Sequence, residues 1–238
     1  MTLCLHAGAE AIDYDGLRQL ETPKATATHV PLPHFRLVDL VAHSLAYHGH
    51  EVTEQHHGIT PDGMRYFGVL HLKSAYTGYT DMLGLRNSHD RTLPVGIAFG
   101  STTFVCDNLA FSADHVIKTK HTANLKMRLP GLVGELIEPI ADQRESQHRK
   151  LLGYQNTALT DMQADAAVVQ MFRQDVISVT KIADVLAEYD IPSHDWGDKT
   201  LWRLFNAATF VLTGRVLENP QTTTRLHTIL DGIAETVQ

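Results

Sequence analysis

Residues 51–73 read EVTEQHHGITPDGMRYFGVLHLK, a turn sequence between two runs rich in β-forming residues. In the turn, residues 60–63, proline fixes φ at one inner position and the glycine after the aspartate accepts a positive φ. The flanking runs, 51–57 and 64–73, have the length and composition of strands. The stretch therefore predicts a β-hairpin.

Apolar residues also alternate with small ones between positions 93 and 99, which predicts a further strand. We expect the chain to turn at Gly100 and to return as a strand over residues 102–106. Pro94 has no amide hydrogen to donate to a neighbouring strand, so the first of these strands should begin there or lie at an edge. Together with the hairpin, these strands predict an antiparallel sheet.

Helical periodicity lies on both sides of the predicted strands. Apolar residues recur at helical spacing between Val38 and Leu45, and Gly49 is a stop signal. Far downstream, Thr160 and Gln163 have the spacing of a capping box, which marks the start of a helix. The helices expected from the sequence span about residues 34–49, 132–152 with a break at Pro139, 160–175, 178–189, 200–213 and 222–237.

These patterns predict an α+β protein, in which an antiparallel sheet carries a packed N-terminal helix and is followed by a helical C-terminal half. Residues 1–33 contain prolines that deny helix to the residues before them, and they are expected to form an irregular N-terminal arm. Residues 34–130 are expected to form the α/β sheet core and residues 131–238 the helical region, within one domain.

The composition excludes several classes of protein. The chain has 238 residues, 43% of them hydrophobic, which is enough for a full core and argues against disorder. The sequence has neither a signal-peptide pattern nor a run of about 18 apolar residues, so we expect no membrane association. Cys4 and Cys106 are far apart and form no disulfide framework. A cytoplasmic location is expected.

One basic strip stands out in a chain whose formal net charge is −7. Residues 115–130 contain no acid, and their cations are Lys118, Lys120, Lys126 and Arg128. Such a run is often only a solvated surface. It is also what a groove that follows a nucleic-acid backbone requires, although an acidic chain does not coat DNA indiscriminately.

Fifteen histidines are a high count, but they have no H-E-x-x-H motif and no zinc-ligand spacing. His56 and His57 are neighbours in a predicted strand and therefore point to opposite faces, so they cannot bind one ion from the same side. The sequence predicts no metal site, and it does not identify a cofactor.

Three motifs carry a resemblance to a known family. They are residues 83–90 (LGLRNSHD), residues 104–112 (FVCDNLAFS) and residues 202–209 (WRLFNAAT). Together they resemble the domain of unknown function 932, also called phage/plasmid-like protein; here the third motif continues with Phe210, where that family favours an acid and a histidine. The resemblance implies a setting on prophages, plasmids and mobile islands beside DNA-maintenance genes. It implies no chemistry.

The first motif has two interpretations. Asn, Ser and Asp side chains bond their own backbone in turns, so residues 86–90 can be a turn between strands. Alternatively, the Arg86 guanidinium binds a phosphate through two hydrogen bonds, while Asn87, Ser88 and His89 add further hydrogen bonds. The aromatic residues that are either core or stacking platforms for bases are Tyr66, Phe67, Tyr76 and Tyr79.

The leading hypothesis is a mobile-element accessory protein that binds nucleic acid, with single-stranded DNA in replication or recombination favoured and a homo-oligomer allowed. Its expected contacts are Arg86, Asn87, Ser88, His89, Arg91, Lys118, Lys120, Lys126 and Arg128. Two alternatives stay open. One is a histidine- or metal-dependent hydrolase of nucleotides or phosphodiesters, with His89, Asp90, Asp107 and His115 as its candidates. The other is a counter-defence factor that binds a host protein.

Overall fold

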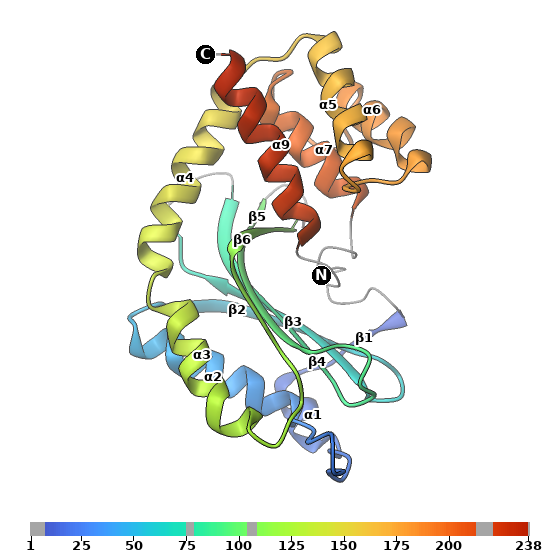
Figure 1. Ribbon diagram of the computed structural model, residues 1–238. Helices are drawn as coiled ribbons and strands as arrows, with labels where there is room; N and C mark the ends of the chain where they lie inside the picture. Colours follow the sequence, from blue (N-terminus) through green and yellow to red (C-terminus); the bar gives the residue numbers. More distant parts are fainter. Residues whose placement is uncertain (1–7, 75–78, 104–108, 213–220, 238) are drawn as a thin grey trace.

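The computed structural model describes residues 8–74, 79–103, 109–212 and 221–237 (Figure 1). The fold is α+β, as predicted: a six-stranded antiparallel sheet with N-terminal helices against it, followed by a helical C-terminal half. The strands are β1 (Glu10–Ala11), β2 (Val52–Ile59), β3 (Arg65–Leu72), β4 (Tyr79–Ser88), β5 (Val95–Thr103) and β6 (Leu109–Thr119). The helices are α1 (Tyr14–Gln19), α2 (His34–Tyr47), α3 (Leu125–Ile137), α4 (Ile140–Asn156), α5 (Asp161–Arg173), α6 (Ile182–Asp190), α7 (Leu201–Val211) and α9 (Gln221–Val237).

The strand order in the sheet is the order in the chain, β1 to β6, and each strand pairs antiparallel with the next. The predicted hairpin is confirmed: Ile59 lies opposite Tyr66, and Gly63 has the positive φ of 68° that its turn requires. Farther across the sheet, Arg86 of β4 lies opposite Gly96 of β5. Every strand therefore pairs with its neighbours in sequence, and the connection between β1 and β2 contains the helices α1 and α2.

The prediction that the chain turns at Gly100, between two neighbouring strands, was wrong. Gly100 does not turn the chain; β5 continues through it to Thr103, and the strand that returns is β6. The register between β5 and β6 shifts between Ala98 and Gly100, so the flexibility of glycine accommodates an irregular ladder there instead of a turn. Of the expected returning strand 102–106, residues 104–108 lie outside the described residues.

The expected N-terminal arm is more regular than its prolines indicate. Residues 8–33 contain the short strand β1, which pairs with β2, and the helix α1. The Asp13 side chain caps α1 by accepting a hydrogen bond from the Gly16 amide at 2.7 Å, and Leu17 is buried. Leu17 and the partly buried Tyr14 pack this short helix against α2, and the Tyr14 hydroxyl donates to Asp39 of α2.

The two faces of the sheet carry separate hydrophobic cores (Figure 1). On the α2 face, side chains such as Leu70, Leu85 and Phe99 pack against α1, α2 and α3. On the opposite face, which we call the α7 face, Phe67 and Val69 pack against the C-terminal helices. Period-two alternation along the strands assigns each residue to one of these cores. The helix α4 joins them, because it starts in the first core and ends in the second.

The helical half follows the predicted order. Thr160 and Gln163 form the expected capping box at the start of α5. Ser178 precedes a short 3-10 helix, Val179–Lys181, before α6 begins at Ile182. None of the helices in the described ranges is both long and apolar enough to cross a membrane.

Candidate nucleic-acid interface

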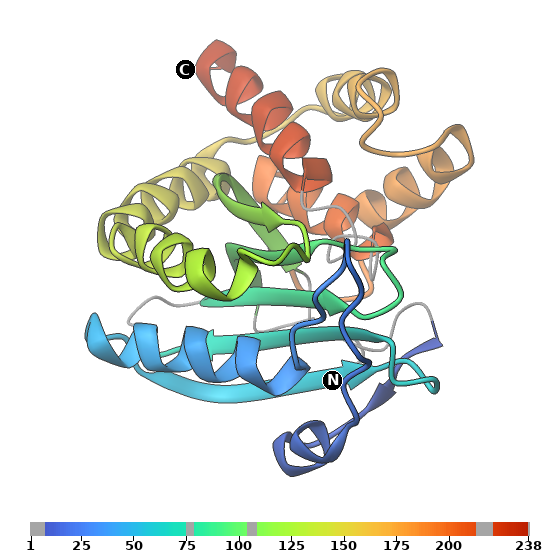
Figure 2. The ribbon, with the colours of Figure 1, turned by 60° about the horizontal axis from the view of Figure 1, so that its bottom comes forward.

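Three chain segments meet at one end of the sheet: residues 24–36 before and into α2, residues 86–91 at the end of β4, and residues 118–128 between β6 and α3. The Val30 amide donates to the His121 carbonyl at 2.8 Å, and the Arg91 guanidinium donates to the Thr26 hydroxyl at 3.1 Å. Figure 2 shows the dark-blue segment before α2 lying against the green segment before α3. We call these three segments the basic end.

Asn87 ties the three segments together from the inside. Its side chain is fully buried, and its amide nitrogen donates to the Leu32 carbonyl at 2.7 Å and to His34 Nδ1 at 2.9 Å. The Asn87 carbonyl oxygen accepts from His121 Nε2 at 2.7 Å. Both amide hydrogens and the carbonyl oxygen are therefore satisfied, which is the condition for burying an asparagine without a large penalty.

These bonds fix the histidine tautomers. Because the Asn87 amide nitrogen can only donate, His34 Nδ1 must accept, so the hydrogen of this ring is on Nε2, which donates to the Gly63 carbonyl at 3.2 Å. The His89 ring stacks on His34 with centroids 4.0 Å apart, and its Nε2 donates to the Leu32 carbonyl at 2.9 Å. Both rings are neutral in this arrangement.

Burial keeps the rings of this network uncharged. Loss of hydration, together with the neighbouring histidines, lowers the pKa of His34 to about 3 and that of His121 to about 4. Burial also lowers the pKa of His89. The network is consequently a neutral, hydrogen-bonded support, and the charge of this region comes from other side chains.

Cations dominate the surface of the basic end. Its three segments contain a single acid, Asp90, which accepts from Arg65 Nε at 2.6 Å and from the Thr92 hydroxyl. These contacts hold the pKa of Asp90 at about 2. The exposed cations of the segments are Lys24, Arg36, Arg91, Lys118, Lys120, Lys126 and Arg128.

Arg86 and Lys118 lie close together on the α7 face, on either side of Gly96 in neighbouring strands. The Arg86 side chain lies over Gly96: a Cβ atom there would be 2.6 Å from Arg86 Nε and 2.7 Å from Arg86 Cγ. Burial and the Arg86 guanidinium both lower the pKa of the Lys118 ammonium. The positive charge of each of these two side chains therefore disfavours the charged form of the other.

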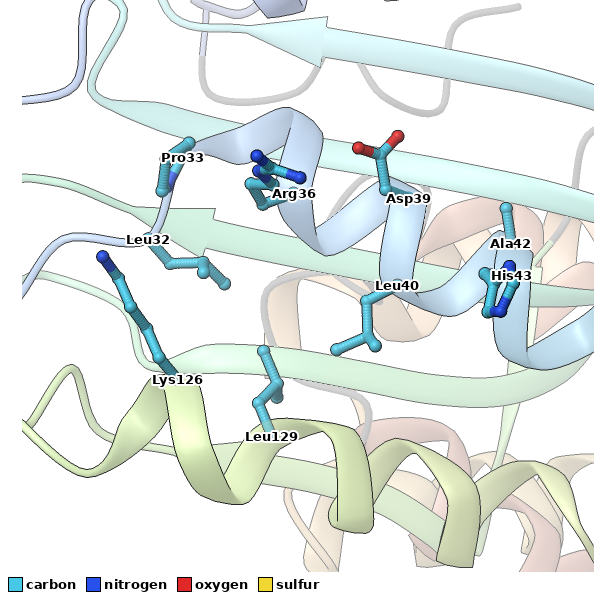
Figure 3. A pocket seen from close by; sticks show the side chains of 9 residues that line it. All are labelled: Leu32, Pro33, Arg36, Asp39, Leu40, Ala42, His43, Lys126 and Leu129. Carbon is cyan, nitrogen blue, oxygen red and sulfur yellow. The ribbon is translucent and has the colours of Figure 1, made fainter.

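A groove of about 760 Å³ runs between α2 and α3, on the α2 face of the sheet and therefore on the opposite face from Arg86 and Lys118. Leu32, Leu40 and Leu129 supply apolar walls (Figure 3). Lys126 reaches across from α3 towards Leu32, and Arg36 stands on α2 at the rim. Asp39, which accepts from the Tyr14 hydroxyl, also lines the groove on α2, so the groove combines an apolar interior with two cations and one carboxylate at its edges.

The structure gives the residues of the first motif different positions. Ser88 Oγ donates to the Leu93 carbonyl at 2.8 Å, and Asn87 and His89 bond inside the network, so all three use their hydrogen bonds within the protein. Arg91 is exposed in the turn after β4, with a φ of 69°. Arg86 is largely buried but lies beside the exposed Lys118.

Of the four aromatic residues considered as stacking platforms, the two whose side chains the structure describes form no stacking surface. Tyr66 and Phe67 are buried on opposite faces of the sheet, in the two cores. Tyr76 lies outside the described residues, as does the side chain of Tyr79.

Of the four residues expected for a hydrolase, the two whose side chains the structure describes, His89 and Asp90, contact different partners. His89 stacks on His34 inside the network, whereas Asp90 pairs with Arg65. Asp107 lies outside the described residues, and so does the side chain of His115.

Sequence reasoning missed two cations of the basic end, Lys24 and Arg36. Both lie in a segment assigned to the N-terminal arm and the first turn of α2. The signal was present in the sequence, since residues 24–36 contain no acid. The sequence does not show that this segment lies beside residues 118–128 in the folded chain.

Comparison with protein families matches most of the chain to a known family model. The family model described as Domain of unknown function (DUF932) covers residues 41–228, which is most of the chain. No curated protein and no solved structure matches the chain at a significant level.

Proposed function

This chain belongs to the DUF932 family, and we propose that it binds single-stranded nucleic acid, with DNA favoured, through its basic end. The binding surface consists of the exposed cations of the three segments. Arg86 and Lys118 lie on its α7 side, and the groove between α2 and α3, with Lys126 and Arg36, lies on its α2 side. In a phage or plasmid setting, such binding fits an accessory role in replication or recombination.

The concentration of cations carries this proposal. The chain as a whole has a net charge of −7, yet three separate segments with one paired acid among them are held together at one end of the sheet. Phosphate backbones bind to such surfaces by releasing their counterions. The remaining acidic surface repels a polyanion and so directs it to this end.

The groove favours a single strand over a duplex. Its walls, formed by Leu32, Leu40 and Leu129, are apolar, and Lys126 and Arg36 stand at its edges together with one carboxylate, Asp39. An unpaired base can enter such a groove while its phosphates meet the cations. The bases of a duplex are stacked and paired, so a duplex would offer only its phosphates.

The test is fluorescence-anisotropy titration of labelled single-stranded DNA, duplex DNA and RNA over a series of salt concentrations. The test variant replaces Lys118, Lys120, Lys126 and Arg128 with alanine. Each phosphate contact on a single strand contributes a slope of about −0.7 to log K against log salt, so seven exposed cations give at most about −5. Removal of four should leave about −2 and weaken binding at low salt at least tenfold.

A variant with the same loss of charge elsewhere controls for net charge alone. It replaces four cations of the helical half with alanine: Arg149, Arg173, Lys181 and Arg225. We expect this variant to keep the wild-type slope. Absence of binding by the wild-type protein at low salt, or equal losses in the two variants, would overturn the proposal.

A further inference from the structure

Three metal-ligating side chains converge on the β2–β3 hairpin, away from the basic end. The ligand atoms of Glu54, His56 and His71 all lie within 4.8 Å of one another. His56 Nε2 is 3.1 Å from Glu54 Oε1, and the rings of His56 and His71 are 5.4 Å apart at an interplanar angle of 82°.

The hairpin register brings these residues together. Glu54 and His56 are two positions apart on β2, so their side chains point to the same face. His71 lies opposite Glu54 on β3, next to a register shift between Val52 and Glu54. Since Val69 pairs with His56 and packs into the core of the α7 face, all three ligands point to that face.

We propose that Glu54, His56 and His71 form a binding site for a divalent transition-metal ion of the zinc class. Two imidazoles and one carboxylate suit Zn²⁺, Co²⁺ or Ni²⁺, whereas Mg²⁺ and Ca²⁺ prefer sites made of oxygen alone.

The geometry fits this ion after small side-chain movements. Nitrogen and oxygen ligands lie about 2.0–2.2 Å from Zn²⁺, which places neighbouring ligand atoms about 3–3.5 Å apart. The Glu54–His56 separation of 3.1 Å already has this value. The Glu54 side chain is 63% exposed and that of His56 is 24% exposed, so water can complete the coordination sphere.

The proposed site is independent of nucleic-acid binding at the basic end. His71 is four residues along β3 from Phe67, the residue opposite Arg86, and this separation corresponds to about 13 Å of strand. Each site therefore can be tested by substitutions that leave the other in place.

The experiment uses the untagged protein after removal of metal with a chelator. Calorimetric titration with Zn²⁺ at pH 7.5 should give one equivalent bound with micromolar or tighter affinity. Titration with Co²⁺ should give visible absorption bands of nitrogen-coordinated cobalt. We expect Glu54→Gln and His71→Ala each to weaken Zn²⁺ binding at least tenfold and to change the Co²⁺ spectrum.

The matched control is His43→Ala, which removes an exposed histidine on α2. This variant should bind Zn²⁺ like the wild type, and DNA binding should be unchanged in Glu54→Gln. The proposal fails if the wild-type protein binds no Zn²⁺ at these concentrations. It also fails if Glu54→Gln and His71→Ala bind as the wild type does, because the ion then resides on other histidines.

Discussion

Acidification from pH 7 to pH 5 should unfold this protein, because its buried histidines are neutral in the folded state. Burial lowers the pKa of His34 to about 3, and those of His57, His121 and His227 to about 4. In the unfolded chain a histidine takes up its proton near pH 6.5. The unfolded state therefore binds more protons below that pH, and the free energy of unfolding falls as the pH is lowered.

The size of the effect follows from linkage. At pH 5 a histidine with a pKa of about 4 when folded and about 6.5 when unfolded costs about 2 kcal/mol, so four such residues cost about 8 kcal/mol. Burial raises the pKa of Asp81, and this carboxyl opposes the trend as it takes up its proton in the folded protein. Domain stabilities are about 5–15 kcal/mol, so the loss is enough to unfold many domains.

Urea unfolding at pH 7, 6 and 5, followed by far-ultraviolet circular dichroism, measures this loss. Below pH 6.5 the midpoint should move to lower urea with each step, and calorimetric unfolding at pH 5.5 should show uptake of about three protons or more. A change in unfolding free energy of less than about 1 kcal/mol between pH 7 and pH 5 would refute the reasoning, since it would mean that these rings are protonated or solvated in the folded protein.

Three substitutions test the packing described above. Asn87→Ala leaves two buried imidazole nitrogens without a partner and should lower the free energy of unfolding by about 2–5 kcal/mol. Hydrogen exchange should show the segment before α2 opening. A loss of unfolding free energy below about 1 kcal/mol would contradict the network. Gly96→Ala forces Arg86 to move and should cost about 1–3 kcal/mol in denaturant melts, whereas Gly131→Ala, with open space at its Cβ position, should be neutral or stabilising. Thr160→Ala removes a capping box and should cost about 1 kcal/mol; an unchanged melting temperature would show that α5 does not depend on its cap.

Local signals in the sequence predicted the elements whose causes are local. The turn over residues 60–63 fixes the β2–β3 hairpin, and Thr160 with Gln163 fixes the start of α5. The prediction of a turn at Gly100 was wrong because glycine occurs both in turns and at irregular positions within strands. Only the pairing of β5 with β6 shows which of the two applies here. The short helix α1 depends on burying Leu17 against α2, which its own residues do not reveal.

The candidate site was less predictable, since its residues come together only in the folded chain. The sequence marks Lys118 to Arg128 as basic, but not that Arg36 lies beside them. The sequence predicted Asn87 to be a turn residue or a phosphate-binding residue. It could not show the hydrogen bonds to His34 and His121, because these partners are 53 and 34 positions away. Glu54 and His71 could have been paired by counting outwards from the hairpin turn, had the register shift near Val52 been known.

The sequential order of the strands also affects how the protein is made on the ribosome. Each strand can pair as soon as the next one emerges, so the sheet can grow while synthesis continues. Asn87, however, cannot complete its bonds until residue 121 has emerged, and Phe67 and Val69 stay uncovered until α7 and α9 follow. During synthesis the apolar residues of the α7 face are thus exposed, and this interval is when the nascent chain depends most on chaperones.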